Sequence, residues 1–149
     1  MAQATIGISA AQVTASTDTP AFRLGTVGGY DDPTNGYQEF VYGSANGAIT
    51  GAGYGVVEQT GFDFIMATTT TTAPGSSGYG TRFGAAQAAL ADNEFGWFQI
   101  YGKGSIRTLA SAAIGTRLSG IVVLTATGGS EATNTDAVFS YPTVSTTLA

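Results

Sequence analysis

Two short carboxylate clusters are the residues of this sequence best suited to acid–base chemistry. Asp31 and Asp32 are adjacent, and Asp92 lies two positions before Glu94. Glycoside hydrolysis needs two carboxyl groups held across a bound sugar. Both pairs, however, lie among Asn, Gly and Pro residues typical of turns, where Asp and Asn side chains bond the local backbone. We therefore interpret both pairs as turn residues and predict that the protein is not an enzyme.

Histidine and cysteine are both absent. Their absence excludes Ser-His-Asp and Cys-His catalysis and disulfide bonds within the chain, and it argues against the usual zinc sites. An EF-hand calcium loop is also excluded at Asp31–Gly36, because Pro33 occupies the third position, where a ligand is needed. A looser calcium loop built from Asp31, Asp32 and Asn35 is the alternative. We predict no metal site and no cofactor.

Other ligand motifs are incomplete. The glycine-rich stretch Gly75–Gly80 lacks the Lys-Ser/Thr pair of a phosphate-binding loop. The basic residues are scattered singly and form no stripe, so we expect no nucleic-acid partner; they are Arg23, Arg82, Lys103, Arg107 and Arg117. The sequence also lacks a run of about 18 apolar residues, as a membrane helix requires, and a charged amino-terminal signal. We expect no membrane association.

The composition favours a surface that is covered in an assembly. Charged residues make up 10% of the 149-residue chain and hydrophobic residues 43%, with a net charge of −5. An ordinary globular protein has about a quarter charged residues. So few charges leave little to keep a lone monomer soluble, and we expect part of the surface to be buried in an assembly.

The sequence predicts that strands are the elements that position these residues. Short β-branched or aromatic segments alternate with Gly, Asn, Asp and Thr, and Asn35-Gly36 and Asn46-Gly47 predict turns. The best helix candidate is the alanine-rich run Phe83–Leu90. We predict an all-β, single-domain β-barrel or β-sandwich of about eight short antiparallel strands. The predicted strands are Phe22–Val27, Tyr37–Tyr42, Tyr54–Gln59, Phe62–Thr68, Trp97–Tyr101, Ser105–Leu109, Leu118–Thr125 and Ala137–Tyr141.

The terminal segments look different from the body. Small and polar residues, threonine above all, dominate residues 1–20 and 143–149. We predict that these two segments are extended arms on a body that spans residues 21–142. We expect the amino-terminal arm to be fixed by a neighbouring molecule, for example by adding a strand to it.

The stretch Trp97–Tyr101 holds the single tryptophan and divides into two faces by strand alternation. Phe98 and Ile100 are apolar and should face the core. Trp97, Gln99 and Tyr101 carry polar groups and are our candidate interface residues. We therefore expect Phe98→Ala to destabilise the fold and Trp97→Ala to harm assembly more than folding.

The connection that follows this stretch has three possible registers. A turn at Gly102-Lys103 would place Ser105 opposite Ile100, and a turn at Lys103-Gly104 would place Arg107 there. A five-residue loop from Tyr101 to Ser105 would place Ile106 opposite Ile100 instead. We favour this loop because it keeps one face apolar.

Aromatic side chains could also stack on sugars. Carbohydrate-binding sandwiches use exposed aromatics in this way, but the same residues are common in strands and at interfaces. The candidates are Tyr30, Tyr37, Tyr42, Tyr54, Tyr79, Trp97 and Tyr101. Glycan binding is therefore an alternative function.

The segment Arg82–Gly102, with Phe95-Gly96-Trp97-Phe98-Gln99 at its centre, resembles a motif of the tailed-phage capsid decoration proteins, also called head cement proteins. That motif has a strand ending in Gly-Val-Ala, an acidic turn, and then Tyr-Gly-Trp-Val-Gln. Ala85 stands here in place of the valine. The segments Phe22–Gly25, Gln38–Tyr42 and Tyr141–Val144 also look similar.

The resemblance implies a virion structural protein with a β-barrel or β-sandwich body and no enzymatic activity. It implies that the chain binds the major capsid protein on the capsid exterior, as a trimer more often than a dimer. A tail or fibre component of the virion is the alternative.

Overall fold

The computed structural model describes residues 6–68, 71, 82–109 and 131–139. The described residues form an all-β domain, as the sequence predicts, with one short helix that was not predicted. Its elements are β1 (Ile6–Gly7), α1 (Ala10–Val13), β2 (Val27–Asp32), β3 (Gly36–Ala45), β4 (Gly55–Glu58), β5 (Asp63–Met66), β6 (Arg82–Ala86), β7 (Phe95–Leu109) and β8 (Glu131–Phe139).

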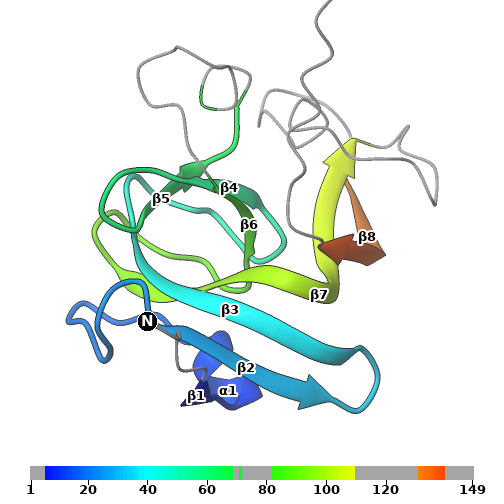
Figure 1. Ribbon diagram of the computed structural model, residues 1–149. Coiled ribbons are helices and arrows are strands. Elements are labelled where there is room, and N and C mark those ends of the chain that lie inside the picture. The colour runs from blue at the N-terminus through cyan, green and yellow to red at the C-terminus, as the bar shows by residue number, and fades with distance from the viewer. Residues whose placement is uncertain (1–5, 69–70, 72–81, 110–130, 140–149) are drawn as a thin grey trace, which may run out of the picture.

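Five strands close into a barrel, in the order β3-β5-β4-β6-β7 and back to β3 (Figure 1). The ring closes because β3 pairs with both β5 and β7. Outside the barrel, β2 and β1 extend the sheet from β3, and β8 pairs with the second half of β7. The pairs β1–β2 and β3–β5 are parallel, whereas we expected antiparallel strands throughout.

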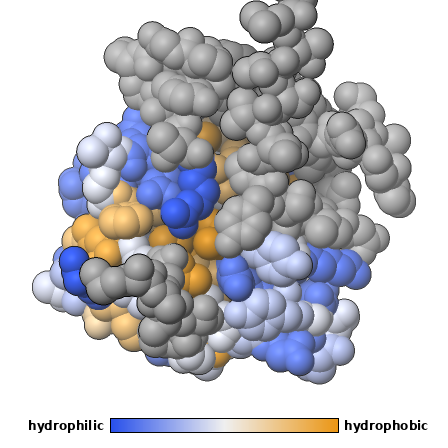
Figure 2. Space-filling view, in the orientation of Figure 1, coloured by the Kyte–Doolittle hydropathy of each residue, from blue (hydrophilic) through white to orange (hydrophobic). Residues whose placement is uncertain are grey.

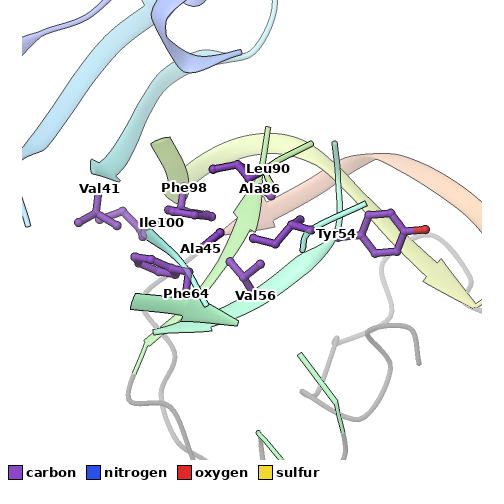
Figure 3. Packing of buried hydrophobic residues seen from close by; sticks show 10 residues of the cluster. Val41, Ala45, Tyr54, Val56, Phe64, Ala86, Leu90, Phe98 and Ile100 are labelled. Atoms are coloured by element: carbon purple, nitrogen blue, oxygen red, sulfur yellow. The ribbon is translucent and has the colours of Figure 1, made fainter. Parts of the chain in front are cut away.

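The barrel interior is filled by aliphatic and aromatic side chains from all five strands and the adjoining loops (Figure 3). Phe64 and Phe98 stack at its centre, with ring centroids 4.0 Å apart. Ile100 and Val41 belong to the same cluster. The prediction that Phe98 and Ile100 face the core is therefore confirmed.

A second cluster lies on the opposite face of β3 and β7. It contains Phe40, Tyr42 and Trp97, and it is covered by Ile8 and Val13 from the amino-terminal segment. Main-chain hydrogen bonds hold that segment in place: Ile8 donates to Gly29, and Thr17 exchanges two bonds with Phe95. The described part of the predicted arm, residues 6–20, thus packs on its own sheet.

Two of the predicted elements are wrong. The strand predicted at Phe22–Val27 starts only at Val27, because the chain turns just before it: the Thr26 amide and hydroxyl both donate to the Arg23 carbonyl. The helix candidate Phe83–Leu90 begins instead as strand β6, which pairs with β4 and β7. Its small residues permit this pairing, since a Cβ on Gly84 would lie 2.8 Å from the carbonyl oxygen of Gln99.

The predicted loop at Tyr101–Ser105 is also wrong. All three registers that paired Trp97–Tyr101 with the residues after this loop are therefore wrong too. Residues 95–109 form one continuous strand, β7. Gly102 has a φ of 93° and the register shifts between Gly104 and Ile106, so the strand bends there without turning back. Gln99 pairs with Phe40 and Ala85 on the two flanking strands, so it does not face Arg107.

Most of the other predicted strands and turns are confirmed. β3, β4 and β5 lie where Tyr37–Tyr42, Tyr54–Gln59 and Phe62–Thr68 were predicted. The Asn35-Gly36 turn joins β2 to β3, and a bend follows β3 at Asn46-Gly47. Strand Leu118–Thr125, the end of Ala137–Tyr141 and the arm 143–149 lie outside the described residues.

Candidate functional site

The adjacent carboxylates Asp31 and Asp32 end strand β2. Asp32 Oδ1 accepts hydrogen bonds from the amides of Thr34 and Asn35, at 2.9 and 2.7 Å. This is the local backbone bonding for which Asp is favoured in turns. The carboxylate of Asp32 thus holds the hairpin between β2 and β3.

The second pair is used in the same way. Asp92 Oδ1 accepts from the Gly47 amide at 2.7 Å, and Glu94 Oε2 accepts from the Ala91 amide at 2.8 Å. Asn93, between them, has a φ of 65°. Both carboxylates therefore cap backbone amides where the loop before β7 meets the loop after β3. Among the described residues, no three His, Cys, Asp or Glu side chains gather closely enough to hold a metal ion.

Trp97 is buried inside its own chain, with 2% of its surface exposed. Its ring meets those of Phe22 and Tyr42 at centroid distances of 5.2 and 5.1 Å. The tryptophan anchors the amino-terminal segment to the sheet, so in this structure it has no surface to offer a partner.

Gln99 is also buried, in a network of side-chain amides. Its Nε2 donates to the carbonyls of Tyr101 and Lys103 at 3.3 and 3.1 Å, and its Oε1 accepts from Gln87 at 3.0 Å. Gln38 donates to the same Lys103 carbonyl. The network donates to the backbone carbonyls of Tyr101 and Lys103 on either side of Gly102, so Gln99 has a structural role.

Tyr101 is the one predicted interface residue that is exposed, by 40%, and Tyr37 is exposed by 46%. Glu39 lies on the strand between β2 and β7, directly paired with Tyr101. Tyr37 Oη donates to Glu39 Oε1 at 3.3 Å. We call Tyr37, Glu39 and Tyr101 the tyrosine–glutamate face. The sequence marks Tyr37 as an aromatic that could stack on a sugar, but it does not single out Glu39, although alternation along β3 places the two on one face.

A partly buried ion pair lies elsewhere, at the paired positions Glu58 of β4 and Arg82 of β6. Glu58 Oε2 is 2.9 Å from Arg82 Nε, with side-chain exposures of 9% and 34%. Burial raises the pKa of the Glu58 carboxyl above its usual value, and the Arg82 guanidinium only partly opposes this rise. Sequence reasoning missed the pair because the two residues are 24 positions apart, with strand β5 between them in the chain.

Arg107, another scattered cation, is held against the end of the barrel. Its guanidinium carbon lies 4.8 Å from the centre of the Tyr54 ring, and its Nε donates to the Ala52 carbonyl at 3.0 Å. Such a cation–π contact is common in folded proteins. Arg107 thus ties β7 to the loop before β4.

None of the helices in the described part of the chain has the length and hydrophobicity needed to cross a membrane. Comparison of the sequence and structure with protein-family models, curated proteins and solved structures finds no match.

Proposed function

We propose that this protein is a structural component of a phage virion, which decorates the outer surface of the capsid and stabilises the shell. It binds the major capsid protein and acts as a homo-oligomer, with a trimer favoured. The proposal starts from the resemblance of Phe95–Gln99 and its flanking segments to capsid decoration proteins. The closed barrel agrees with the body that this resemblance implies.

One observation on the structure supports a binding role most strongly. Three of the four carboxylates singled out as candidates for chemistry, Asp32, Asp92 and Glu94, bond backbone amides instead. The two exposed large hydrophobic side chains described, Tyr37 and Tyr101, lie close together on one sheet. A rigid barrel with an aromatic face suits protein contact, and weak contacts repeated over a shell add by multivalency.

Particles that lack the protein test this role. We expect them to release DNA at a lower temperature and after a milder drop in salt than complete particles. Adding the purified protein back should restore the difference. Equal tolerance of heat and osmotic shock in the two kinds of particle would refute the cementing role.

Glycan binding is the second candidate function, because two exposed tyrosines beside a carboxylate also suit a sugar. A glycan array tests it with the wild-type protein and Tyr101→Ala. Tyr101 replaces Trp97 as the residue to change, since Trp97 is buried. The absence of any bound glycan for the wild-type protein would remove this candidate.

A further inference from the structure

The tyrosine–glutamate face is built across three strands. Glu39 of β3 pairs with Gly29 of β2 on one side and with Tyr101 of β7 on the other. Directly paired residues project to the same side of a sheet. Tyr37, two positions before Glu39, shares that side because side chains alternate along a strand.

Packing fixes the relative positions of these side chains. A Cβ on Gly29 would lie 2.6 Å from Tyr37 Oη, so the tyrosine ring occupies the space above this glycine. From there its hydroxyl reaches Glu39. On the other side of the sheet, Tyr30 stacks on Phe40 with ring centroids 5.7 Å apart. The strands that carry the two exposed tyrosines are therefore packed on the opposite side of the sheet.

Carboxylates outnumber cations near this face, where Lys103 lies two positions after Tyr101 on β7. Asp31 is exposed and pairs directly with Tyr37, which adds a second carboxylate beside Glu39. Figure 2 shows hydrophilic residues gathered on the lower right of the visible face, where Figure 1 places the β2–β3 hairpin. The whole chain carries a net charge of −5. This charge favours a cationic partner.

Arginine fits the face better than lysine does. Its planar guanidinium donates two parallel hydrogen bonds to a carboxylate and stacks on aromatic rings. Lysine offers a strongly hydrated point charge without this geometry. Tyrosine and arginine are also the residues that dominate binding energy at protein interfaces.

We propose that the tyrosine–glutamate face binds an arginine side chain on the surface of a partner protein. The guanidinium pairs with the Glu39 carboxylate and lies against the ring of Tyr37 or Tyr101. The identity of the partner as the capsid shell rests on the proposed function, whereas the arginine chemistry rests on this face alone.

NMR titration of the intact protein tests the proposal. The probe is the blocked peptide acetyl-Gly-Arg-Gly-amide, added at constant ionic strength while the tyrosine ring signals are followed. We expect the signals of Tyr37 and Tyr101 to shift and saturate. The matched peptide acetyl-Gly-Lys-Gly-amide should bind more weakly, and Glu39→Gln should weaken arginine binding about 3- to 10-fold. Asp18→Asn, which removes an exposed carboxylate outside this face, should leave binding unchanged.

Several results would overturn the proposal. Equal shifts with both peptides, or shifts unaffected by Glu39→Gln, would mean non-specific attraction to an acidic chain. Saturation by an N-acetylglucosamine oligomer without saturation by the arginine peptide would assign the face to glycans. Ring shifts that depend on protein concentration alone would assign it to a second copy of the chain. Because the titration uses no capsid, its failure is separate from failure of the particle experiment.

Discussion

Tyr42 and Trp97 are directly paired across β3 and β7, and their rings meet edge to face with centroids 5.1 Å apart. The Tyr42 hydroxyl also accepts a hydrogen bond from the Ala21 amide at 3.0 Å. This aromatic pair is therefore the site where the amino-terminal segment joins the barrel. The single tryptophan therefore stabilises the fold of its own chain, and we expect its replacement to reduce the stability of the isolated protein.

Trp97→Ala should destabilise the isolated protein by about 3–5 kcal/mol, because a buried aromatic side chain leaves a cavity when truncated. Tyr101→Ala, a control four residues along the same strand, should change stability by no more than about 0.5 kcal/mol. Urea unfolding measures both. Equal losses for the two variants would show that Trp97 is not buried, and a loss confined to assembly would restore the interface hypothesis.

Phe98→Ala should also cost about 3–5 kcal/mol, since Phe98 is fully buried and stacks on Phe64. A double-mutant cycle with Phe64→Ala measures the coupling of the two rings. We expect a coupling of about 0.5–1.5 kcal/mol, as is typical of aromatic pairs. Additive losses, with no coupling, would contradict the stacked arrangement.

Gly102→Ala should destabilise the protein more than Gly36→Ala. Both glycines have a positive φ, 93° and 74° respectively, which costs an L-residue about 1–2 kcal/mol. At Gly36 a new Cβ would meet no atom within 4 Å, whereas at Gly102 it would lie 2.5 Å from the carbonyl oxygen of Tyr37. Thermal unfolding of the two variants compares them. Equal losses would mean that β7 is not bent against β3 at this point.

Glu58 should make stability depend on pH. Burial is the main cause that raises the pKa of Glu58 in the folded state. Its contribution to the free energy of unfolding is therefore complete below the unfolded pKa of about 4.3, and it is lost as the pH rises through the folded-state pKa. Glu58→Gln cannot ionise, so its free energy of unfolding should rise relative to wild type across that interval. Arg82→Gln keeps Glu58 without its counter-charge and should lose stability more steeply with pH.

Urea unfolding from about pH 4 to pH 8 measures the three proteins. A stability difference between Glu58→Gln and wild type that fell with rising pH would contradict this account. It would mean that attraction to Arg82 outweighs burial.

Sequence patterns over a few residues predicted those parts of the fold that depend on neighbours along the chain. Alternation placed Phe98 and Ile100 in the core, and the Asn35-Gly36 signal located the β2–β3 turn. The continuity of β7 was missed because Gly102-Lys103-Gly104 has the composition of a turn. The Lys103 carbonyl is held instead by Gln38, which is 65 residues away along the chain.

Long-range packing also decided the candidate site. The polar groups of Trp97 and Gln99 suggested a wet interface, but Ile8, Phe22 and Gln87 come from other segments and bury them. Tyr101 remains exposed, and its paired residue Glu39 has Gly29 as its partner on β2. Alternation predicted one face for Gln99 and Tyr101, but a register shift pairs Gln99 with Phe40 and Tyr101 with Glu39, two adjacent residues that point to opposite sides of the sheet.

The central proposal, that the protein binds the outside of a capsid shell, is tested most directly by locating it on particles of the phage proposed to carry it. Labelled protein should be imaged by electron microscopy on intact particles. We expect signal distributed over the head, at repeated positions of the lattice, and reduced for Glu39→Gln if the tyrosine–glutamate face makes the contact. Signal confined to the tail, or absent from particles altogether, would contradict the claim.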